Sequence, residues 1–115
     1  MPAERVIAKN DLAFAVLDVY PVSLGHTLVI PHRHVHDFLE LTADEASAIF
    51  ALLCLARRTL DVRHKPAGFN FGANIGAAAG QTVMHAHMHL IPRYAGDVAE
   101  PVGGIRNLIP GKGRY

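Results

Sequence analysis

The chain has 115 residues, of which 50% are hydrophobic and 18% are charged, a composition within the range of ordinary globular proteins. This length predicts one domain, spanning residues 1–115, which buries roughly two-thirds of the surface of its unfolded chain without disulfide or metal staples. Eleven Lys and Arg against ten Asp and Glu give a formal charge of +1. This balance excludes a global field that would attract nucleic acid or an acidic membrane, so we expect neither partner.

The N-terminal part predicts a hairpin followed by another strand. Residues 5–8 and 12–17 are apolar-rich runs that flank an Asn-Asp dipeptide, which favours a turn. Residues 26–30 form a largely β-branched and apolar run that Pro31 ends.

One long helix is predicted in the middle of the chain. Thr42 and Glu45 form a capping box, and apolar residues then recur at helical spacing to about Arg63. Pro66 follows and ends this pattern.

The second half predicts more strands and a loop-like tail. Residues 69–73 alternate like a strand, residues 76–80 form a loop of small residues, and residues 82–91 form the next run. The glycine-rich residues 102–115 are predicted as a tail that a partner orders. Together these elements predict an α+β domain on a mostly antiparallel sheet.

The single cysteine and the apolar runs indicate a cytoplasmic protein. Cys54 lies within an apolar run and reads as a small core residue in a reducing compartment. The longest apolar run, residues 46–56, is far shorter than the roughly 20 residues of a membrane helix. The first residues lack the basic-then-apolar order of a secretory signal.

Histidine is the anomaly of the composition. Six of the eight histidines fall into two triplets of identical spacing, at residues 32–36 and 85–89. On a strand, His85, His87 and His89 would share one face, about 6.6 Å apart. Three interpretations stay open at this point: a metal site, a nucleophile with helper groups, or the polar face of an exposed strand.

The surroundings of the second triplet favour the nucleophile. A metal site would need further ligands, and no Asp or Glu lies between His64 and Asp97. A neutral imidazole can attack phosphorus and divide one difficult transfer into two easier steps. Such chemistry needs a phosphate cradle, and the small residues at 72–76 and 80–82 allow backbone N–H groups to approach anionic oxygens.

These residues resemble the signature of the histidine triad family of nucleotide hydrolases and transferases. The sequence His-Ala-His-Met-His-Leu-Ile at 85–91 follows Gly-Gln-Thr-Val at 80–83 and precedes Pro92-Arg93. The resemblance continues upstream through residues 21–31, similar to the Pro-Gly-His strand entry of the family. It implies about five antiparallel strands with one long and one short helix. It also implies a homodimer formed across the helix and a strand, with a nucleoside phosphate in a surface groove and no cofactor.

The resemblance also implies catalytic roles for four histidines. His87 would be the nucleophile that takes the nucleotidyl group from the α-phosphate, and His89 would donate a hydrogen bond to a non-bridging phosphate oxygen. The carbonyl of His85 would fix the tautomer of the nucleophile, and the His85 ring would pair with His26.

Five further residues match binding positions of the family. Asn74, Gly80, Gln81 and Thr82 would contact phosphate or the leaving group. Asp18, eight residues before His26 as in the family, would bind the ribose hydroxyls of an adenine or other purine nucleoside. The apolar residues before Asp18 are candidate walls of a base pocket, with core packing as the alternative for at least two of them: Phe14, Val16 and Leu17.

The chain departs from many bacterial members of the family at its start. Those members carry a Cys-x-x-Cys pair that binds a structural zinc with the histidine matching His34, whereas this chain opens with Met-Pro-Ala-Glu. We therefore predict no metal, and residues 32–36 are predicted as a solvated loop. Residues 103–110 resemble the tail of the bacterial hydrolase branch, in which Arg106, Lys112 and Arg114 would reach phosphates, the partner subunit or only solvent.

The sequence therefore predicts a nucleotidyl hydrolase that cleaves dinucleoside polyphosphates or nucleoside phosphoramidates through a nucleotidyl-His87 intermediate. The Gly-Gln-Thr sequence favours the polyphosphate branch, because serine is usual at the Thr82 position of the phosphoramidase branch. Two alternatives stay open: a non-catalytic, dimeric nucleotide-binding module, and a metal-dependent enzyme that uses the second triplet as ligands.

Overall fold

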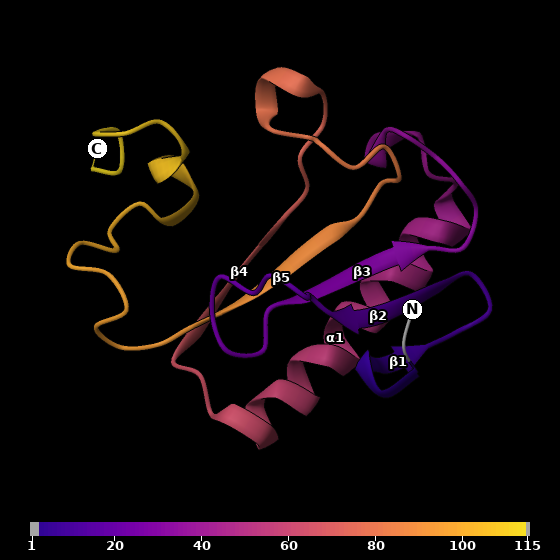
Figure 1. Ribbon diagram of the computed structural model, residues 1–115, viewed down its shortest axis with the longest axis horizontal. Helices are drawn as coiled ribbons and strands as arrows, with labels where there is room; N and C mark the ends of the chain where they lie inside the picture. The colour runs from indigo at the N-terminus through magenta and orange to yellow at the C-terminus, as the bar shows by residue number, and fades with distance from the viewer. Residues whose placement is uncertain (1–2, 115) are drawn as a thin grey trace.

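The computed structural model describes residues 3–114 and shows a five-stranded antiparallel sheet with one long helix on one face (Figure 1). The strands lie in the order β1-β2-β3-β5-β4. The elements are β1 (Val6–Lys9), β2 (Ala13–Leu17), β3 (Thr27–Pro31), α1 (Ala43–His64), β4 (Gly68–Gly72) and β5 (Met88–Arg93). Short 3₁₀ helices lie at Ala3–Arg5 (η1), Phe38–Glu40 (η2), Ala77–Ala79 (η3) and Gly104–Leu108 (η4).

Helix α1 has the limits that its local sequence dictates. The Thr42 hydroxyl accepts a hydrogen bond from the Glu45 N–H, and the Glu45 carboxylate accepts one from the Thr42 N–H, so the predicted capping box is present. At the other end, Lys65 has a φ of 50° in the left-handed region, and the following Pro66 prevents the helix from continuing.

The core lies between α1 and one face of the sheet. Alternate residues of a strand point to opposite faces, and on this face β2 contributes the small side chains of Ala13 and Ala15 to the core. These alanines allow the helix to approach closely, and Ile49, Leu52 and Leu60 are at most 2% exposed against the sheet. Burial of each such side chain contributes roughly 1.5–3 kcal/mol to stability. The opposite face of the sheet carries the cavity described below.

The strand predicted for residues 82–91 begins later than its alternating pattern indicated. Ladder pairing starts at Met88, and the preceding segment bonds instead to the loop after β3, where the Ala86 N–H donates to the Val35 carbonyl at 2.7 Å. Pro31 is the last residue of β3, paired with Ala13, rather than a residue beyond the strand. Between residues 3 and 114, the expected second helix is replaced by the 3₁₀ segments.

The tail is more ordered than its composition predicted. It contains η4, and Asn107 and Arg106 side chains donate to the carbonyls of Val102 and Lys112. A side chain at Gly103, whose φ is 91°, would overlap the carbonyl of Gly113, so these glycines allow the tail to close on itself. Figure 1 shows the tail folding back beside the edge of the sheet. Residue 115, the last of the predicted tail, lies outside the described residues.

No helix formed by residues 3–114 has the length and apolar character needed to cross a membrane.

The loop after β3 is held to the start of α1 by a bidentate ion pair. The Arg33 guanidinium donates to both oxygens of the Glu45 carboxylate, at 2.9 and 2.8 Å, and the Glu45 side chain is only 6% exposed. The hydrogen bond from Arg33 is the main cause of a pKa of about 2 for Glu45, and the Thr42 backbone adds to it. Glu45 therefore joins the helix cap to the loop that contacts Ala86.

The lowered pKa of Glu45 predicts a pH dependence of folding. Its contribution to stability is fully present above the ordinary pKa of 4.5 and is lost as the pH falls through about 2. In Glu45→Gln, we expect lower stability at neutral pH and a smaller further loss in acid, measured as urea midpoints at about pH 7 and about pH 3. Equal losses of midpoint in acid for both proteins would contradict this assignment.

Candidate functional site

A cavity of about 570 Å³ lies on the face of the sheet opposite α1. Strands β2 and β3, the loop after β2, the β4–β5 loop and the start of β5 all contribute to it. Its lining residues are Phe14, Asp18, Val19, Tyr20, Leu28, Ile30, Asn74, Gly80, Gln81, Thr82, Val83, His85, His87 and His89. The structure thus gathers every predicted site residue at this cavity except His26, which lies directly behind His89.

The register of the sheet explains why the histidines meet. Leu28 of β3 pairs with His89 of β5, and His26 precedes β3 by one residue on the same face as Leu28, so the two histidines meet. His87 precedes β5 by one residue, and its ring lies 5.0 Å from the His89 ring.

A backbone carbonyl fixes the proton of His87. The Nδ1 of His87 lies 2.9 Å from the carbonyl oxygen of His85, which accepts hydrogen bonds only. In the neutral ring, Nδ1 therefore carries the hydrogen, and Nε2 keeps its lone pair. This contact is the tautomer-fixing bond that the family resemblance implied for the His85 carbonyl.

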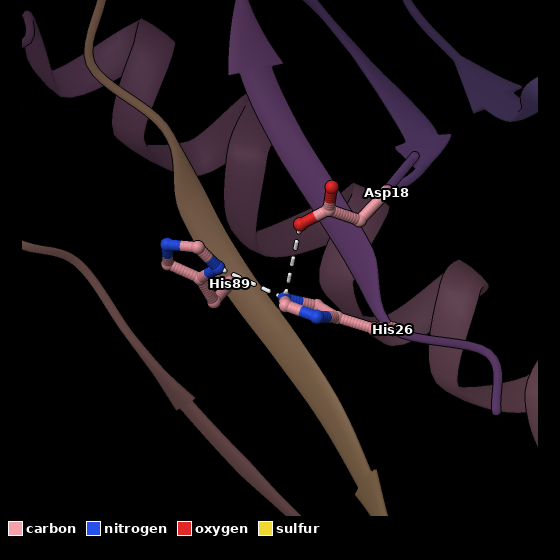
Figure 2. A group of neighbouring side chains, drawn as sticks. All are labelled: Asp18, His26 and His89. Atoms are coloured by element: carbon pink, nitrogen blue, oxygen red, sulfur yellow. Dashed lines mark hydrogen bonds and ion pairs between the residues drawn. The ribbon is translucent and has the colours of Figure 1, made fainter. Parts of the chain in front are cut away.

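A chain of hydrogen bonds imposes the opposite tautomer on His89. The Val22 N–H donates to His26 Nδ1 at 3.1 Å, so the hydrogen of neutral His26 is on Nε2. That Nε2–H donates to His89 Nδ1 at 2.9 Å, as the dashed line in Figure 2 marks. His89 consequently carries its hydrogen on Nε2. Two neighbouring rings at one cavity thus offer opposite groups, a lone pair on His87 and an N–H on His89.

The environment keeps both members of this chain neutral. Burial lowers the pKa of His26 below its usual 6.5, against the opposing effect of the Asp18 carboxylate. Burial also lowers the pKa of His89, and the nearby His87 and His26 rings lower it further. A second proton on His89 would direct its Nδ1–H against the Nε2–H of His26, so protonation would break the chain.

Asp18 lies at the end of the same row of side chains. Its Oδ1 accepts from the Tyr20 N–H at 2.9 Å, and its Oδ2 is 3.6 Å from His26 Nε2 (Figure 2). This second distance is too long for a hydrogen bond. The Oδ2 atom therefore keeps acceptor capacity beside the cavity, as the predicted contact with ribose hydroxyls requires.

Asp18, His26 and His89 also offer three ligand atoms within 4.8 Å of one another, the kind of cluster that can hold a metal ion. The direction of the hydrogen bonds opposes this use. A metal bound to His26 Nε2 would displace the hydrogen on that nitrogen. The other nitrogen, Nδ1, accepts a hydrogen bond from the Val22 N–H, so the ring would then carry no hydrogen on either nitrogen. This donor set therefore fits a chain of hydrogen bonds better than a metal site.

His85 departs from its predicted pairing. Its ring does not contact His26, whose partner is His89. Instead, His85 Nε2 lies 2.8 Å from the Pro31 carbonyl, and its Nδ1 lies 3.4 Å from Nδ1 of His34. The reason is that His85 precedes the strand and turns toward the loop after β3.

Gln81 also acts differently from its predicted phosphate contact. Its side chain is buried, and its Oε1 accepts from the Gly76 N–H at 2.9 Å. Its Nε2 donates to the carbonyls of His36 and Val83, at 2.9 and 3.2 Å. Gln81 thus uses its amide to shape the small-residue loop, in which Gly76 and Gly80 have positive φ. The exposed side chains of Asn74 and Thr82 remain at the cavity.

The first histidine triplet lies outside the lining of the cavity. The rings of His32, His34 and His36 are exposed as predicted, but His32 stacks on Phe14 with centroids 5.4 Å apart. Phe14 lines the cavity, whereas Val16 is fully buried, in keeping with the alternative of core packing. The sequence interpretation missed the exposed Tyr20, which lies outside the quoted motifs, and the Val22 amide, because a backbone N–H carries no residue-specific signal.

Comparisons with known proteins identify the family of the chain. The sequence model of the HIT domain family matches residues 2–96 of this chain. An uncharacterized HIT-like protein of Mycoplasma genitalium is 43% identical over 88 residues, which cover 76% of this chain and 62% of that protein. An AP-4-A phosphorylase of Mycobacterium tuberculosis is 39% identical over 93 residues, covering 80% of this chain and 48% of that protein.

The solved structures give the same result. A HIT family protein from Bacillus anthracis superposes with a TM-score of 0.74 at 43% identity, covering 77% of this chain and 63% of that chain. The chain therefore spans about three-fifths or less of the length of these relatives. With its matching domain, fold and row of histidines, the chain belongs to the HIT, or histidine triad, family.

Proposed function

We propose that this chain is a nucleotidyl hydrolase or transferase that works through a covalent nucleotidyl-His87 intermediate. The observation that carries the proposal is the pair of opposite tautomers at one cavity: a lone pair on His87 Nε2 beside an N–H on His89 Nε2. The first group is suited to attack phosphorus, and the second is suited to donate to a phosphate oxygen.

The first step forms a phosphorus–nitrogen bond. The lone pair of His87 Nε2 attacks the α-phosphorus while the bond from phosphorus to the leaving group breaks. The leaving group departs with the bonding electron pair and, when it is an amine, takes a proton from solvent. Charge that develops on a non-bridging oxygen is stabilised by the Nε2–H of His89 and by the exposed side chains of Asn74 and Thr82 at the cavity. As His87 becomes positively charged, the His85 carbonyl continues to accept its Nδ1–H.

The second step releases the nucleotide. A water molecule attacks the same phosphorus, the phosphorus–nitrogen bond breaks, and its electron pair returns to His87 Nε2. The water gives up a proton to solvent, and a nucleoside monophosphate leaves. The positive charge in this scheme comes from the imidazole rings and from side-chain donors, so we propose that no metal ion takes part.

The cavity also has features suited to a nucleoside. Asp18 offers a carboxylate oxygen for the ribose hydroxyls, and Phe14 and Tyr20 offer aromatic surface for a purine. We propose dinucleoside polyphosphates or nucleoside phosphoramidates as substrates. The AP-4-A phosphorylase among the relatives supports the first of these classes.

We also propose that the chain forms a homodimer across α1 and β4. β4 is an edge strand, and a groove of about 380 Å³ lies between it and the helix. Phe50 and Phe71 line this groove and are 64% and 55% exposed. Large apolar side chains at an open strand edge are typical of an interface, and a second copy would cover them.

The interface is tested by a charge at its centre. We expect the wild type to have twice the 12.4 kDa mass of the chain in solution and Phe71→Lys to have the single-chain mass, measured by light scattering after size exclusion. Leu39→Lys is the matched control, because Leu39 is 80% exposed away from the groove. A monomeric wild type, or a dimeric Phe71→Lys, would contradict the proposed interface.

The mechanism is tested by removal of the nucleophile. With EDTA present, we expect the wild type to release AMP from diadenosine polyphosphates or from an adenosine phosphoramidate, measured by chromatography. His87→Ala should lose this activity by roughly a thousandfold or more, because the attacking atom is gone.

His36→Ala serves as the control, since its exposed ring does not line the cavity, and it should keep wild-type activity. Release of AMP by His87→Ala at the wild-type rate would rule out the covalent intermediate. Calorimetric binding of AMP by a wild type that turns over no substrate would instead favour the nucleotide-binding module.

A further inference from the structure

The loop between β2 and β3 carries the amide that sets the tautomer of His89, and hydrogen bonds hold this loop more than apolar packing does. Val22 and Leu24 are 71% and 62% exposed, so burial of their side chains contributes little to the position of the loop. His26 lies where the loop joins β3 (Figure 2). Whatever fixes the loop therefore also decides whether the Val22 N–H stays on His26 Nδ1.

A tight turn connects the loop to His26 from one side. The His26 N–H donates to the Ser23 carbonyl at 3.1 Å, which closes the turn. Gly25 within the turn has a φ of 90°, and a Cβ at that position would lie only 2.9 Å from a side-chain carbon of Leu60. Ser23 is thus bonded to His26 and is the chain neighbour of Val22, so a displacement of Ser23 would move the Val22 amide directly.

The end of β5 holds the same loop from the other side. The ladder between β3 and β5 ends before β5 does, and Pro92 has no N–H with which to extend it. The Pro92 carbonyl instead accepts a hydrogen bond from the Ser23 hydroxyl at 2.7 Å, and the Tyr94 hydroxyl donates to the Leu24 carbonyl at 2.6 Å. Two side-chain hydroxyls thus join β5 to the loop where the backbone ladder has ended.

Loss of these two bonds would release the constraint on the His26 hydrogen. Once the Val22 N–H is withdrawn, the hydrogen of His26 can move to Nδ1, and the lone pair on Nε2 then faces His89 Nδ1. His89 would carry its hydrogen on Nδ1 and lose the N–H at Nε2. Asp18 Oδ2, 3.6 Å from His26 Nε2, favours the original tautomer, so we expect exchange between the two arrangements instead of complete reversal.

We propose that Ser23 and Tyr94 are positioning residues, whose hydroxyl groups hold the Val22 amide on His26 and thereby keep the hydrogen of His89 on Nε2. Both residues lie outside the lining of the cavity, so they act through the loop and not by contact with the substrate. The effect on the tautomers follows from the hydrogen bonds alone, whereas the effect on the rate rests on the nucleotidyl transfer proposed above.

Nitrogen-15 NMR of the histidine rings tests this role in the double variant Ser23→Ala/Tyr94→Phe. At slightly alkaline pH, we expect His26 and His89 to exchange between tautomers in the variant and to hold one tautomer in the wild type. His87 should keep its hydrogen on Nδ1 in both proteins, because its backbone partner lies outside this loop. Unchanged His26 and His89 rings in the double variant would overturn the proposal. A variant in which the His87 tautomer also changes would overturn it too, because the effect would then be a general disturbance of the fold.

Two single changes provide the controls. Ser23→Thr retains a hydroxyl at the same position and should keep the wild-type tautomers at all three rings. Ser47→Ala removes an exposed hydroxyl from α1, away from the loop, and should also leave them unchanged. Exchange at His26 and His89 in Ser47→Ala would contradict the assignment to the hydroxyls at the end of β5.

The release of AMP from an adenosine 5′-phosphoramidate, measured with EDTA present, gives a second readout. For the double variant, we expect kcat to fall at least about fivefold while KM stays within about twofold, because the N–H of His89 acts on charge that develops during the reaction. Ser23→Thr should restore kcat to the wild-type value. A kcat that the double variant leaves unchanged overturns the proposed effect on the rate. If the wild type releases no AMP, the nucleotidyl transfer fails, and the NMR comparison alone decides the positioning role.

Discussion

The protons on two imidazole rings are placed by the main chain, and the proposed chemistry depends on that placement. The His85 carbonyl holds the hydrogen of His87 on Nδ1, and the Val22 amide acts through His26 to hold the hydrogen of His89 on Nε2. The same residue type therefore supplies an electron pair at one position and a proton at its neighbour. Burial strengthens this arrangement, because it lowers the pKa values of His26 and His89 and keeps both rings neutral.

An ion pair and hydrogen bonds that start at helix α1 hold the segment that carries these histidines. Glu45 caps α1 and binds Arg33, and the loop that follows Arg33 accepts the Ala86 N–H and the amide of Gln81. The segment before β5 is thus fixed by side chains and carbonyls where it has no strand partner. This support allows an irregular backbone to carry His85 and His87 in a defined orientation.

Local sequence signals predicted the helix and most of the strands. The features that they did not predict depend on contacts between residues far apart in the chain. The capping box of Thr42 gives the start of α1, and the apolar runs and turn residues give β1 to β4 to within one residue at each end. Alternation alone cannot show that the segment before β5 bonds to the loop after β3, because the alternation that starts at Met84 continues without a break into the strand. The pairing of His26 with His89, rather than with His85, depends on sheet register between segments 63 residues apart. Gln81 belongs to the family motif, but only the structure shows that its side-chain amide hydrogen-bonds to the backbone of Gly76 and His36.

The opposite tautomers are the central claim, and nitrogen-15 NMR of the imidazole rings tests them without any substrate. In protein labelled with nitrogen-15 at histidine, at slightly alkaline pH, we predict a protonated Nδ1 for His87 and a protonated Nε2 for His89, assigned with His87→Ala and His26→Gln. The replacement of His26 should also disturb the His89 pattern and leave that of His87 unchanged. The same tautomer on both rings, or rapid exchange between tautomers at His89, would contradict the account.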